Sequence, residues 1–353
     1  SMNQLQWIIN GFLLALSVLM ILAGRLGDLY GSRRILFIGM AMFGLSSLGA
    51  GLSANIHTLL VFRLLQGMST AILYTIPTAI VSQSFPIEQR GKALGMLYAI
   101  NGIGLAIGPV LGGIIVGTLG WRWIFIINAP LIIISFIICL PNIKPSPITK
   151  QKTPLDGWGL TLLALGLTCL IIALIEGDKF GWNSPQIMSL FVTASLCLLS
   201  FYQVEKRSQN PIMPLHLFTH PQFIGGVVAS SSLGFYYVLA FFFMPLFLHN
   251  VLGYSNFQLG FILLPTTIMM AALSPLIGKA TDHFGPKPIL IVGALLFIFS
   301  ASLQLYFTDS SPLILILMAF AIMGIGWAAC LGPSTVAALQ TIPASNSGVA
   351  TGI

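Results

Sequence analysis

The sequence predicts an all-α polytopic membrane protein made of two related halves, and three observations lead to this prediction. The chain of 353 residues is 56% hydrophobic, with a mean hydropathy of +0.96, and only 7% of its residues are charged, which is too few to solvate the surface of a soluble protein. Its apolar residues form runs of about 20, the length that crosses a bilayer as a helix. A short charged segment between two such runs occurs twice.

The apolar runs, bounded by charged or Pro/Gly-rich segments, predict eleven membrane spans. The buried strands of a soluble α/β protein would be only about 4–8 residues long, so the runs exclude that class. The expected spans are 5–24, 35–54, 58–84, 92–117, 120–140, 157–176, 185–204, 222–248, 256–277, 288–307 and 312–340.

The basic residues set the orientation of these spans. Only Arg122 and Lys179 fall on one side of the predicted membrane, and Arg63 lies within a span. All the others fall on the opposite side, which the positive-inside rule assigns to the cytoplasm. The net charge of +7 therefore reflects cytoplasmic loops and does not predict a nucleic-acid partner. The cytoplasmic set is Arg25, Arg33, Arg34, Arg90, Lys92, Lys144, Lys150, Lys152, Lys206, Arg207, Lys279 and Lys287.

The repeated charged segment relates the two halves. The first copy reads Gly24-Arg-Leu-Gly-Asp28-Leu-Tyr-Gly31-Ser-Arg33-Arg34, and the second reads Gly278-Lys-Ala-Thr-Asp282-His-Phe-Gly285-Pro-Lys287. Matching positions are 254 residues apart, as Asp28 and Asp282 are. A looser match pairs Gly91 and Gly95 with Gly348 and Gly352. The pattern predicts a parallel duplication, as in transporters whose halves rock about a central site.

Each copy of the segment has the residues of a tight charged turn. Gly24 and Gly31 permit a close backbone approach and a sharp connection. We expect Asp28 to meet a helix N-terminus or a nearby arginine, which would form a cytoplasmic clasp between helices. The alternative is a positive-inside loop in which the aspartate is solvated.

The register of the repeat predicts the organisation of the chain. Residues 1–140 are expected to form an N-terminal bundle and residues 222–353 a C-terminal bundle. Residues 157–204 then form an inserted transmembrane hairpin between the cytoplasmic linkers 141–156 and 205–221. Because the first span must run inward from the outer face, we expect a further helix ahead of it, and we expect the C-terminal bundle to continue beyond residue 353.

One charge lies at membrane depth. Arg63 falls several residues inside its span, where an unpaired charge costs at least a few kcal/mol and normally marks a functional cavity. Gln66, one turn further on, is expected to share its polar environment. The alternative is an arginine that extends to the outer interface. All the acids, by contrast, lie in loops or at span ends: Asp28, Glu88, Asp156, Glu176, Asp178, Glu205, Asp282 and Asp309.

Small residues recur late in the span 92–117. Gly104, Gly108 and Gly112 are four residues apart, so they share one helix face and predict the close approach of a neighbouring helix. Pro109 is expected to kink this helix, and Gly113 is expected to make the backbone next to the kink more flexible.

Together these motifs resemble the major facilitator superfamily of transporters. The first charged segment is similar to the loop between the second and third helices of that superfamily. Leu60-Val-Phe-Arg63-Leu-Leu-Gln66-Gly67 is similar to its fourth-helix motif, and Gly104-Leu-Ala-Ile-Gly108-Pro109-Val-Leu-Gly112-Gly113 resembles the fifth-helix motif of exporters. Trp121-Arg-Trp-Ile-Phe-Ile-Ile-Asn128 and the inserted hairpin resemble the fourteen-helix drug:proton antiporter branch.

The resemblance implies a fold and a set of roles. The fold would be two pseudo-symmetric helical bundles around a central cavity, with the inserted two-helix hairpin. The charged segments would gate the cytoplasmic side, and the fifth-helix motif would help to seal the cavity. Arg63 would take part in proton coupling with a carboxylate that this branch carries in its first helix, so we expect that acid ahead of residue 5; Glu176 and His249 are alternatives. The gating set is Gly24, Asp28, Gly31, Arg33, Arg34, Gly278, Asp282, Gly285 and Lys287.

The residues expected to line the cavity are mostly aromatic, with a flexible and polarisable methionine among them, which suits a bulky amphipathic compound. Packing within the bundle or contact with lipid is the alternative for each side chain. The candidates are Tyr74, Tyr98, Asn101, Phe235, Tyr236, Tyr237, Phe241 and Met244.

These inferences predict a proton-coupled exporter of amphipathic small molecules in the inner membrane of a bacterial cell. Its partners would be the substrate, protons and the lipid bilayer, with a periplasmic adaptor and an outer-membrane channel in a Gram-negative cell. The alternatives are an uptake symporter on the same fold, or a receptor or scaffold that has lost transport. We expect no cofactor, with the proton gradient as the energy source. We also expect no metal and no enzyme activity, because the cysteines lack metal-ligand spacing and no catalytic signature occurs.

Overall fold

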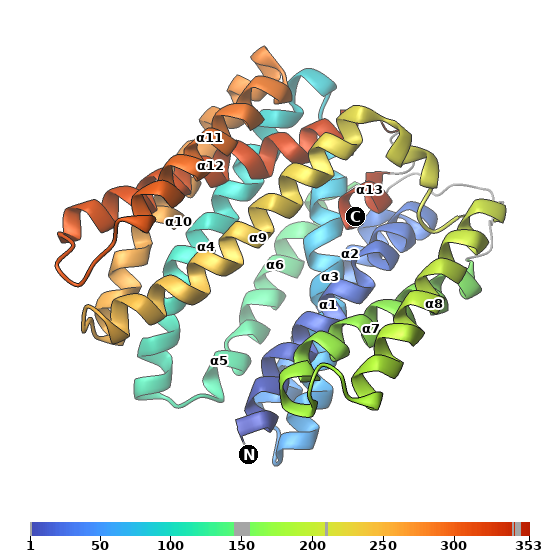
Figure 1. Ribbon diagram of the computed structural model, residues 1–353. Coiled ribbons are helices and arrows are strands. Elements are labelled where there is room, and N and C mark those ends of the chain that lie inside the picture. Colours follow the sequence, from blue (N-terminus) through green and yellow to red (C-terminus); the bar gives the residue numbers. More distant parts are fainter. Residues whose placement is uncertain (1, 145–155, 209–210, 341, 343–346) are drawn as a thin grey trace. The chain divides into compact units, whose positions relative to one another are not determined.

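The computed structural model describes residues 2–144, 156–208, 211–340, 342 and 347–353. Within these residues the chain is helical and has no strand, which confirms the predicted all-α class. The long helices are α1 (Met2–Tyr30), α2 (Ser32–Gly51), α3 (Ile56–Ser84), α4 (Arg90–Thr118), α6 (Asn128–Asn142), α7 (Gly157–Phe180), α8 (Pro185–Arg207), α9 (Pro221–Asn250), α10 (Asn256–Phe284), α11 (Pro286–Leu305) and α12 (Leu313–Gln340) (Figure 1). The short ones are η1 (Ile87–Gln89), α5 (Trp123–Ile126), η2 (Leu215–Thr219) and α13 (Ser347–Gly352).

Eleven helical segments of the described chain are long and apolar enough to cross a membrane, which is the expected number. Several of these helices extend beyond the expected apolar runs, whereas α2 and α11 end before the runs do. The first span was expected to end at residue 24, whereas α1 continues to Tyr30. A helix satisfies its own backbone hydrogen bonds, so it can continue through charged residues where it leaves the apolar layer. The span expected at 120–140 begins instead with the short α5, and α6 follows after Ile127.

Most of each charged segment is helical, so the tight turn expected from the sequence is confined to one residue in each copy. Asp28 lies in the last turn of α1 and Asp282 in the last turns of α10. Only Gly31, with φ of 91°, and Gly285, with φ of 81°, interrupt the helices. A positive φ costs glycine little because it has no Cβ atom. Each turn is therefore a single glycine, after which α2 or α11 begins at once.

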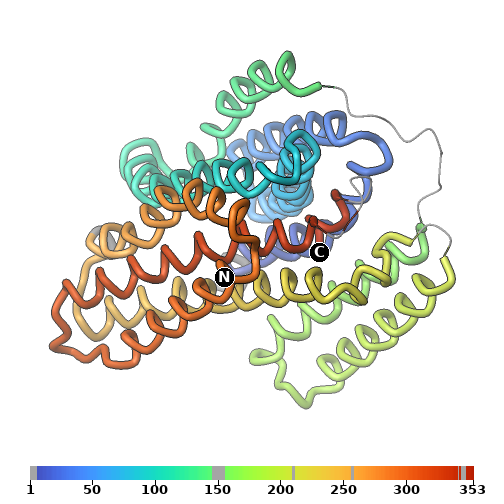
Figure 2. The backbone as a smooth tube through the Cα atoms, turned by 90° about the horizontal axis from the view of Figure 1, so that it is seen from above, coloured from blue at the N-terminus to red at the C-terminus, as the bar shows by residue number. Residues whose placement is uncertain are grey.

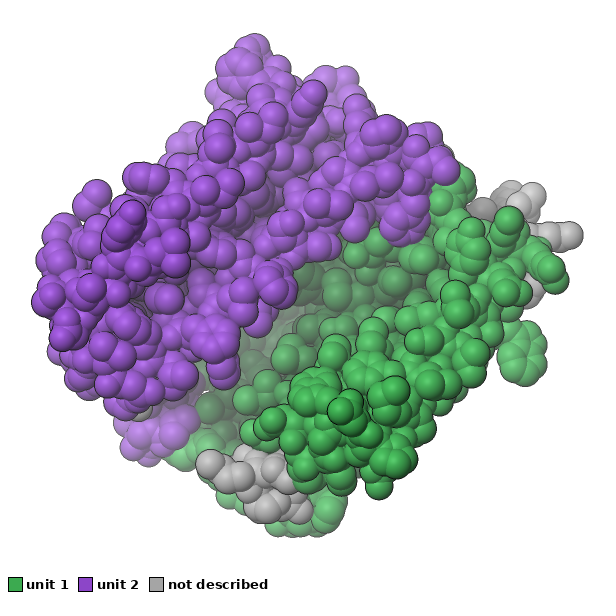
Figure 3. All heavy atoms as spheres, in the orientation of Figure 1, with its two compact units in different colours: residues 1–80, 119–216, 345–353 green, residues 81–118, 217–344 purple. Residues whose placement is uncertain are grey.

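The helices form two compact units (Figure 3). Unit 1 contains residues 1–80, 119–216 and 345–353, and unit 2 contains residues 81–118 and 217–344. These boundaries interleave along the chain because α13 packs on α1 in unit 1, whereas α4 packs on α10 in unit 2. The division into bundles and linkers stays a prediction, and most of the linker expected at 141–156 lies outside the described residues.

In unit 1 an apolar cluster joins the first three helices, and the hairpin formed by α7 and α8 packs beside α1. The cluster consists of Ala23, Ile35, Leu36, Met40, Ala71, Ile72 and Ile76. The hairpin helices α7 and α8 pack side by side (Figure 2). Ser184 caps α8 by accepting a hydrogen bond from Ile187 N, and Pro185 occupies the first helical position, where its missing N–H costs nothing. Trp7 Nε1 donates to Glu176 Oε1 at 2.9 Å, which ties α1 to α7.

In unit 2 the most buried helix is α12, which packs against α4, α9, α10 and α11. Small residues on α12 allow the neighbouring helices to approach it closely. A Cβ atom added to Gly324 would overlap Thr266 O, and Thr266 Oγ1 donates to Phe320 O at 3.0 Å. The apolar cluster around it consists of Ala240, Leu248, Leu259, Ile262, Ile316, Phe320 and Met323.

Candidate functional site

The carboxylate of Asp28 accepts hydrogen bonds from backbone N–H groups in the first turn of α13, within unit 1. Its Oδ1 atom accepts a hydrogen bond from Gly348 N at 2.9 Å, and its Oδ2 atom accepts one from Val349 N at 3.0 Å. N–H groups in the first turn have no partner inside their own helix, and the helix dipole favours a negative charge beside them. Of the two kinds of partner expected for Asp28, the structure therefore shows the helix N-terminus.

Asp282 makes the matching contact within unit 2. Its Oδ1 atom accepts a hydrogen bond from Gly91 N at 2.6 Å, and its Oδ2 atom accepts one from Lys92 N at 2.8 Å. Both N–H groups belong to the first turn of α4. The repeat of 254 positions thus places two aspartates in the same chemical situation, one in each unit.

A close crossing of two glycines accompanies each aspartate contact. A Cβ atom added to Gly24 would overlap Gly348 O, and one added to Gly348 would overlap Gly24 O. Gly278 and Gly91 cross in the same reciprocal way. Two helix backbones approach this closely only where neither carries a side chain. Because each aspartate follows its glycine by one helical turn, the glycine crossing brings the carboxylate to the partner's N-terminus.

The basic residues of the charged segments take different positions. Arg33 Nη2 donates to Leu140 O at 2.7 Å, near the end of α6, and its guanidinium lies 5.7 Å from the ring centre of Phe37. Arg34 and Lys287 are exposed. The gating set predicted from sequence thus separates into glycines at crossings and turns, aspartates at helix N-termini, and basic residues on other surfaces.

Arg63 lies in α3 and its guanidinium is directed across to α1. Its Nε atom donates to Ile8 O at 2.9 Å, and its Nη1 atom donates to Gln66 Oε1 at 3.1 Å. The guanidinium carbon lies 4.3 Å from the ring centre of Phe12. Gln66 is 2% exposed, so it shares the polar environment of Arg63 as the one-turn spacing predicts. This arrangement favours a role inside unit 1 over an arginine that merely extends to the outer interface.

The two alternative proton-binding residues are engaged elsewhere. Glu176 accepts hydrogen bonds from Trp7 Nε1 and, at 3.3 Å, from Lys179 Nζ. The Nδ1 atom of the exposed His249 ring is 2.8 Å from Tyr254 O. Neither is a hydrogen-bonding partner of Arg63 in the described part of the chain. Across the same residues, no group of three or more His, Cys, Asp or Glu side chains could hold a metal ion.

Within unit 2, the glycines of the fifth-helix motif make no close contact with another helix. A Cβ atom added to Gly104, Gly108, Gly112 or Gly113 would meet no described atom within 4 Å. Pro109 is also exposed, and α4 continues through it. The close approach occurs in the first half of the same helix, at Gly91 and Gly95, whose added Cβ atoms would overlap Gly278 O and Ser274 O. A four-residue spacing marks a smooth helix face but does not say what covers it.

The structure gathers some of the predicted cavity residues of unit 2 into two clusters. In the first, the Tyr237 ring lies 4.5 Å from the Phe241 ring and 4.3 Å from the Trp327 ring. In the second, Tyr236 Oη donates to Ser300 Oγ at 3.3 Å and accepts from Gln304 Nε2 at 3.0 Å. Trp327, Ser300 and Gln304 were missed from the sequence, where they stand inside apolar runs without a motif.

The other predicted cavity residues are dispersed. Tyr98 is buried, and its Oη atom lies 2.9 Å from Thr335 Oγ1. Tyr74 belongs to unit 1 and is exposed. Phe235 is 72% exposed, a degree that suits contact with lipid. Asn101 is half-buried, and Met244 packs against the apolar cluster of unit 2.

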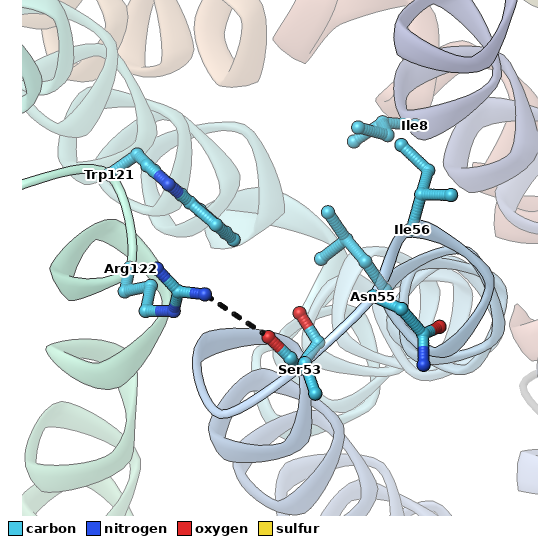
Figure 4. Close-up of a pocket in the computed structure, with 8 residues that line it drawn as sticks. Ile8, Ser53, Asn55, Ile56, Trp121 and Arg122 are labelled. Atoms are coloured by element: carbon cyan, nitrogen blue, oxygen red, sulfur yellow. Dashed lines mark hydrogen bonds between the residues drawn. The ribbon is translucent and has the colours of Figure 1, made fainter.

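Unit 1 contains a pocket of about 400 Å³ beside the connection from α2 to α3. Figure 4 shows Trp121 and Arg122 on one side of it and Ile8 and Ile56 on the other. Arg122 Nη2 donates to Ser53 O at 3.4 Å, and the Arg122 guanidinium carbon lies 4.6 Å from the ring centre of Trp121. None of the predicted cavity residues lines this pocket. The lining residues are Ile8, Ser53, Ala54, Asn55, Ile56, Leu59, Trp121 and Arg122.

Replacing either paired aspartate with asparagine is expected to destabilise the protein. The asparagine NH₂ group would face a backbone N–H, so one hydrogen bond and the negative charge are lost together. We expect Asp28→Asn and Asp282→Asn each to cost about 1–3 kcal/mol, measured as a lower melting temperature of the detergent-solubilised protein. Asp309, an exposed acid between α11 and α12, is the control, and Asp309→Asn should leave the melting temperature unchanged. Equal melting temperatures for all three variants would show that the aspartate contacts add no stability.

Comparison with known proteins gives one family. The family described as Major Facilitator Superfamily matches residues 1–353 of this chain. A solved structure of a double-tryptophan mutant of XylE is similar with a TM-score of 0.67 and 18% sequence identity, covering 99% of this chain and 74% of that one. At this identity the similarity concerns the fold alone, and it agrees with the predicted major facilitator fold.

Two curated relatives match the chain over its whole length. The tetracenomycin C resistance and export protein of Streptomyces glaucescens is 31% identical over 353 residues, which are 100% of this chain and 66% of that protein. The multidrug resistance protein Stp of Mycobacterium tuberculosis (strain CDC 1551 / Oshkosh) is 33% identical over 353 residues, which are 99% of this chain and 65% of that protein. The chain thus spans just under two thirds of the length of these relatives.

Proposed function

The chain belongs to the Major Facilitator Superfamily, and from that premise we propose that it is a proton-coupled secondary active exporter of amphipathic small molecules. It would act as an antiporter by alternating access in a bacterial cell membrane. We further propose that it belongs to the fourteen-helix drug:proton branch, with α7 and α8 as the inserted hairpin.

The observation that carries the direction of transport is the similarity to proteins named for export and resistance. Two such relatives match essentially all of this chain, at 31% and 33% identity. One is named for resistance to and export of tetracenomycin C, and the other for multidrug resistance. An aromatic, amphipathic substrate would suit the Tyr237, Phe241 and Trp327 cluster, whose rings lie within 4.3–6.1 Å of one another.

The paired aspartate contacts support alternating access. Each consists of two hydrogen bonds and a glycine crossing, so it can separate and re-form without any covalent step. We propose that these contacts are the clasps of the cytoplasmic gate and that they open once per cycle. Because the two clasps are repeats of one another, the cytoplasmic gate would be held closed by two equivalent contacts.

Arg63 supports proton coupling through its position and its remaining donors. The hydrogen bonds that described residues make with Arg63 use its Nε and Nη1 atoms, which leaves Nη2 for a negatively charged partner. A guanidinium that binds a carboxylate favours its ionised form, so a proton would be released when that pair forms. We propose that this exchange links proton movement to the transport of the substrate.

Transport into inverted membrane vesicles tests the proposal. With ethidium or doxorubicin as the probe, an imposed ΔpH with an acidic lumen should drive accumulation of the probe. Nigericin, which collapses ΔpH, should abolish the accumulation, and vesicles without the protein give the background. Accumulation only with an alkaline lumen would indicate an uptake symporter instead. Absence of transport for either direction of ΔpH would overturn the proposed function.

A further inference from the structure

A buried serine on α2 of unit 1 is hydrogen-bonded to residues of three other helices, α3, α5 and α6. Ser47 of α2 is fully buried, with 0% exposure. Its Oγ atom donates to Phe125 O at 2.8 Å in α5 and accepts hydrogen bonds from Gln66 Nε2 at 2.9 Å and Asn128 Nδ2 at 3.0 Å. These contacts connect Arg63, through Gln66, to the segment that begins α6.

The single hydroxyl proton of Ser47 determines how the side-chain amide of Gln66 is oriented. A hydroxyl has one proton to donate and two lone pairs to accept with. The proton is used by Phe125 O, so the two amides that reach Ser47 must both present NH₂ groups. Gln66 therefore directs its NH₂ group at Ser47 and its Oε1 atom at Arg63 Nη1, 3.1 Å away. With the opposite orientation, the Gln66 NH₂ group would face the guanidinium, and two donors would meet.

The same segment also touches the guanidinium directly. The ring of Phe125 lies 5.8 Å from the guanidinium carbon of Arg63, on which Phe12 also packs at 4.3 Å. Asn128 Nδ2 makes a second hydrogen bond, to Ile124 O at 3.3 Å, so its amide has a fixed direction as well. The guanidinium is thus oriented through Ile8, Gln66 and the two aromatic rings.

We infer that Ser47 is a positioning residue for Arg63, because it holds the Gln66 amide in the one orientation that accepts from the guanidinium. In this arrangement the described hydrogen bonds of Arg63 use Nε and Nη1 and leave Nη2 for another partner. The inference rests on the proposed function only for its transport consequence, since the orientation itself is a property of unit 1.

Removing the Ser47 hydroxyl tests this. In Ser47→Ala, the Gln66 amide is free to turn, and we expect the turnover number of ΔpH-driven doxorubicin transport to fall about tenfold, equivalent to about 1.4 kcal/mol, with KM changing less than twofold. Ser46→Ala is the matched control. Ser46 is the preceding residue on α2 and is 4% exposed, and its hydroxyl donates to Phe43 O in its own helix. Ser47→Thr, which keeps the hydroxyl, should restore at least half of the activity.

A measurement that needs no transport separates this inference from the proposed function. In protein labelled with ¹⁵N-arginine, the Arg63 signals are assigned as those missing from Arg63→Lys. We expect hindered rotation of the Arg63 guanidinium in the wild type and in Ser46→Ala, and averaged Nη signals in Ser47→Ala. If Ser47→Ala does not fold, Ser47→Cys tests the inference instead, because a thiol is only a weak hydrogen-bonding group, and we expect averaging in the same direction. Unchanged Arg63 signals in the folded variants would overturn the inference, whether or not the wild type transports the probe.

Discussion

Arg63→Lys is expected to lower ΔpH-driven transport at least about 100-fold, which corresponds to about 2.7 kcal/mol. Lysine keeps the positive charge but has a single ammonium group. It cannot donate to Ile8 O and Gln66 Oε1 at once and still present a planar edge to a carboxylate. Initial rates of doxorubicin accumulation in inverted vesicles measure the effect, with the amount of folded protein matched between variants.

The control for this substitution is Arg122→Lys, which makes the same chemical change elsewhere in unit 1. Arg122 has one long hydrogen bond, 3.4 Å to Ser53 O, and lies over Trp121, so we expect a loss of less than about threefold, or roughly 0.65 kcal/mol. Transport by Arg63→Lys at more than a third of the wild-type rate would contradict the proton-coupling role of the guanidinium geometry.

The second large effect is expected at the glycine crossing of unit 2. In Gly91→Ala, the new Cβ atom would overlap Gly278 O and lie 2.6 Å from Asp282 Oδ1. The helices α4 and α10 would have to separate, and both hydrogen bonds to Asp282 would lengthen. Overpacking of this kind costs about 1–3 kcal/mol, occasionally more, so the melting temperature in detergent should fall by several degrees.

Gly104→Ala, on the same helix, provides the contrast for stability. Its added Cβ atom would meet nothing within 4 Å, and alanine is favoured over glycine in a helix by up to about 1 kcal/mol. We therefore expect an unchanged or slightly higher melting temperature. If the two variants melted at the same temperature, the Gly91–Gly278 crossing would not be a close contact. A loss of transport in Gly104→Ala without a loss of stability would support the sealing role that the fifth-helix motif implies.

Much of the architecture follows from the sequence because membrane burial leaves a strong signal. Apolar runs of bilayer length predicted eleven spans, and the described residues contain eleven candidate spans. The charged segment is repeated exactly at its two glycines and its aspartate, which predicted equivalent positions in the two halves. Asp28 and Asp282 each accept two hydrogen bonds from backbone N–H groups in the first turn of another helix. A lone arginine inside an apolar run predicted a polar site at Arg63, where hydrogen bonds to Ile8 and Gln66 are found.

Other features could not be predicted because a sequence pattern does not record the neighbouring helix. Regular four-residue spacing drew attention to Gly104, Gly108 and Gly112, whereas within unit 2 the close contacts of α4 are at Gly91 and Gly95. Trp327 was missed because nothing in its apolar run indicates that its ring packs against Tyr237.

The sequence by itself thus determined what depends on composition and repetition: the membrane class, the number of spans, the duplication and the family. The tertiary structure decided what depends on partners that are distant along the chain. It showed that Asp28 meets the N-terminus of α13, 320 residues away, and that Ser47 orients the amide of Gln66. The physical reason is that hydrogen bonds and close crossings need a particular donor at about 3 Å, and only the packing of helices brings that donor into place.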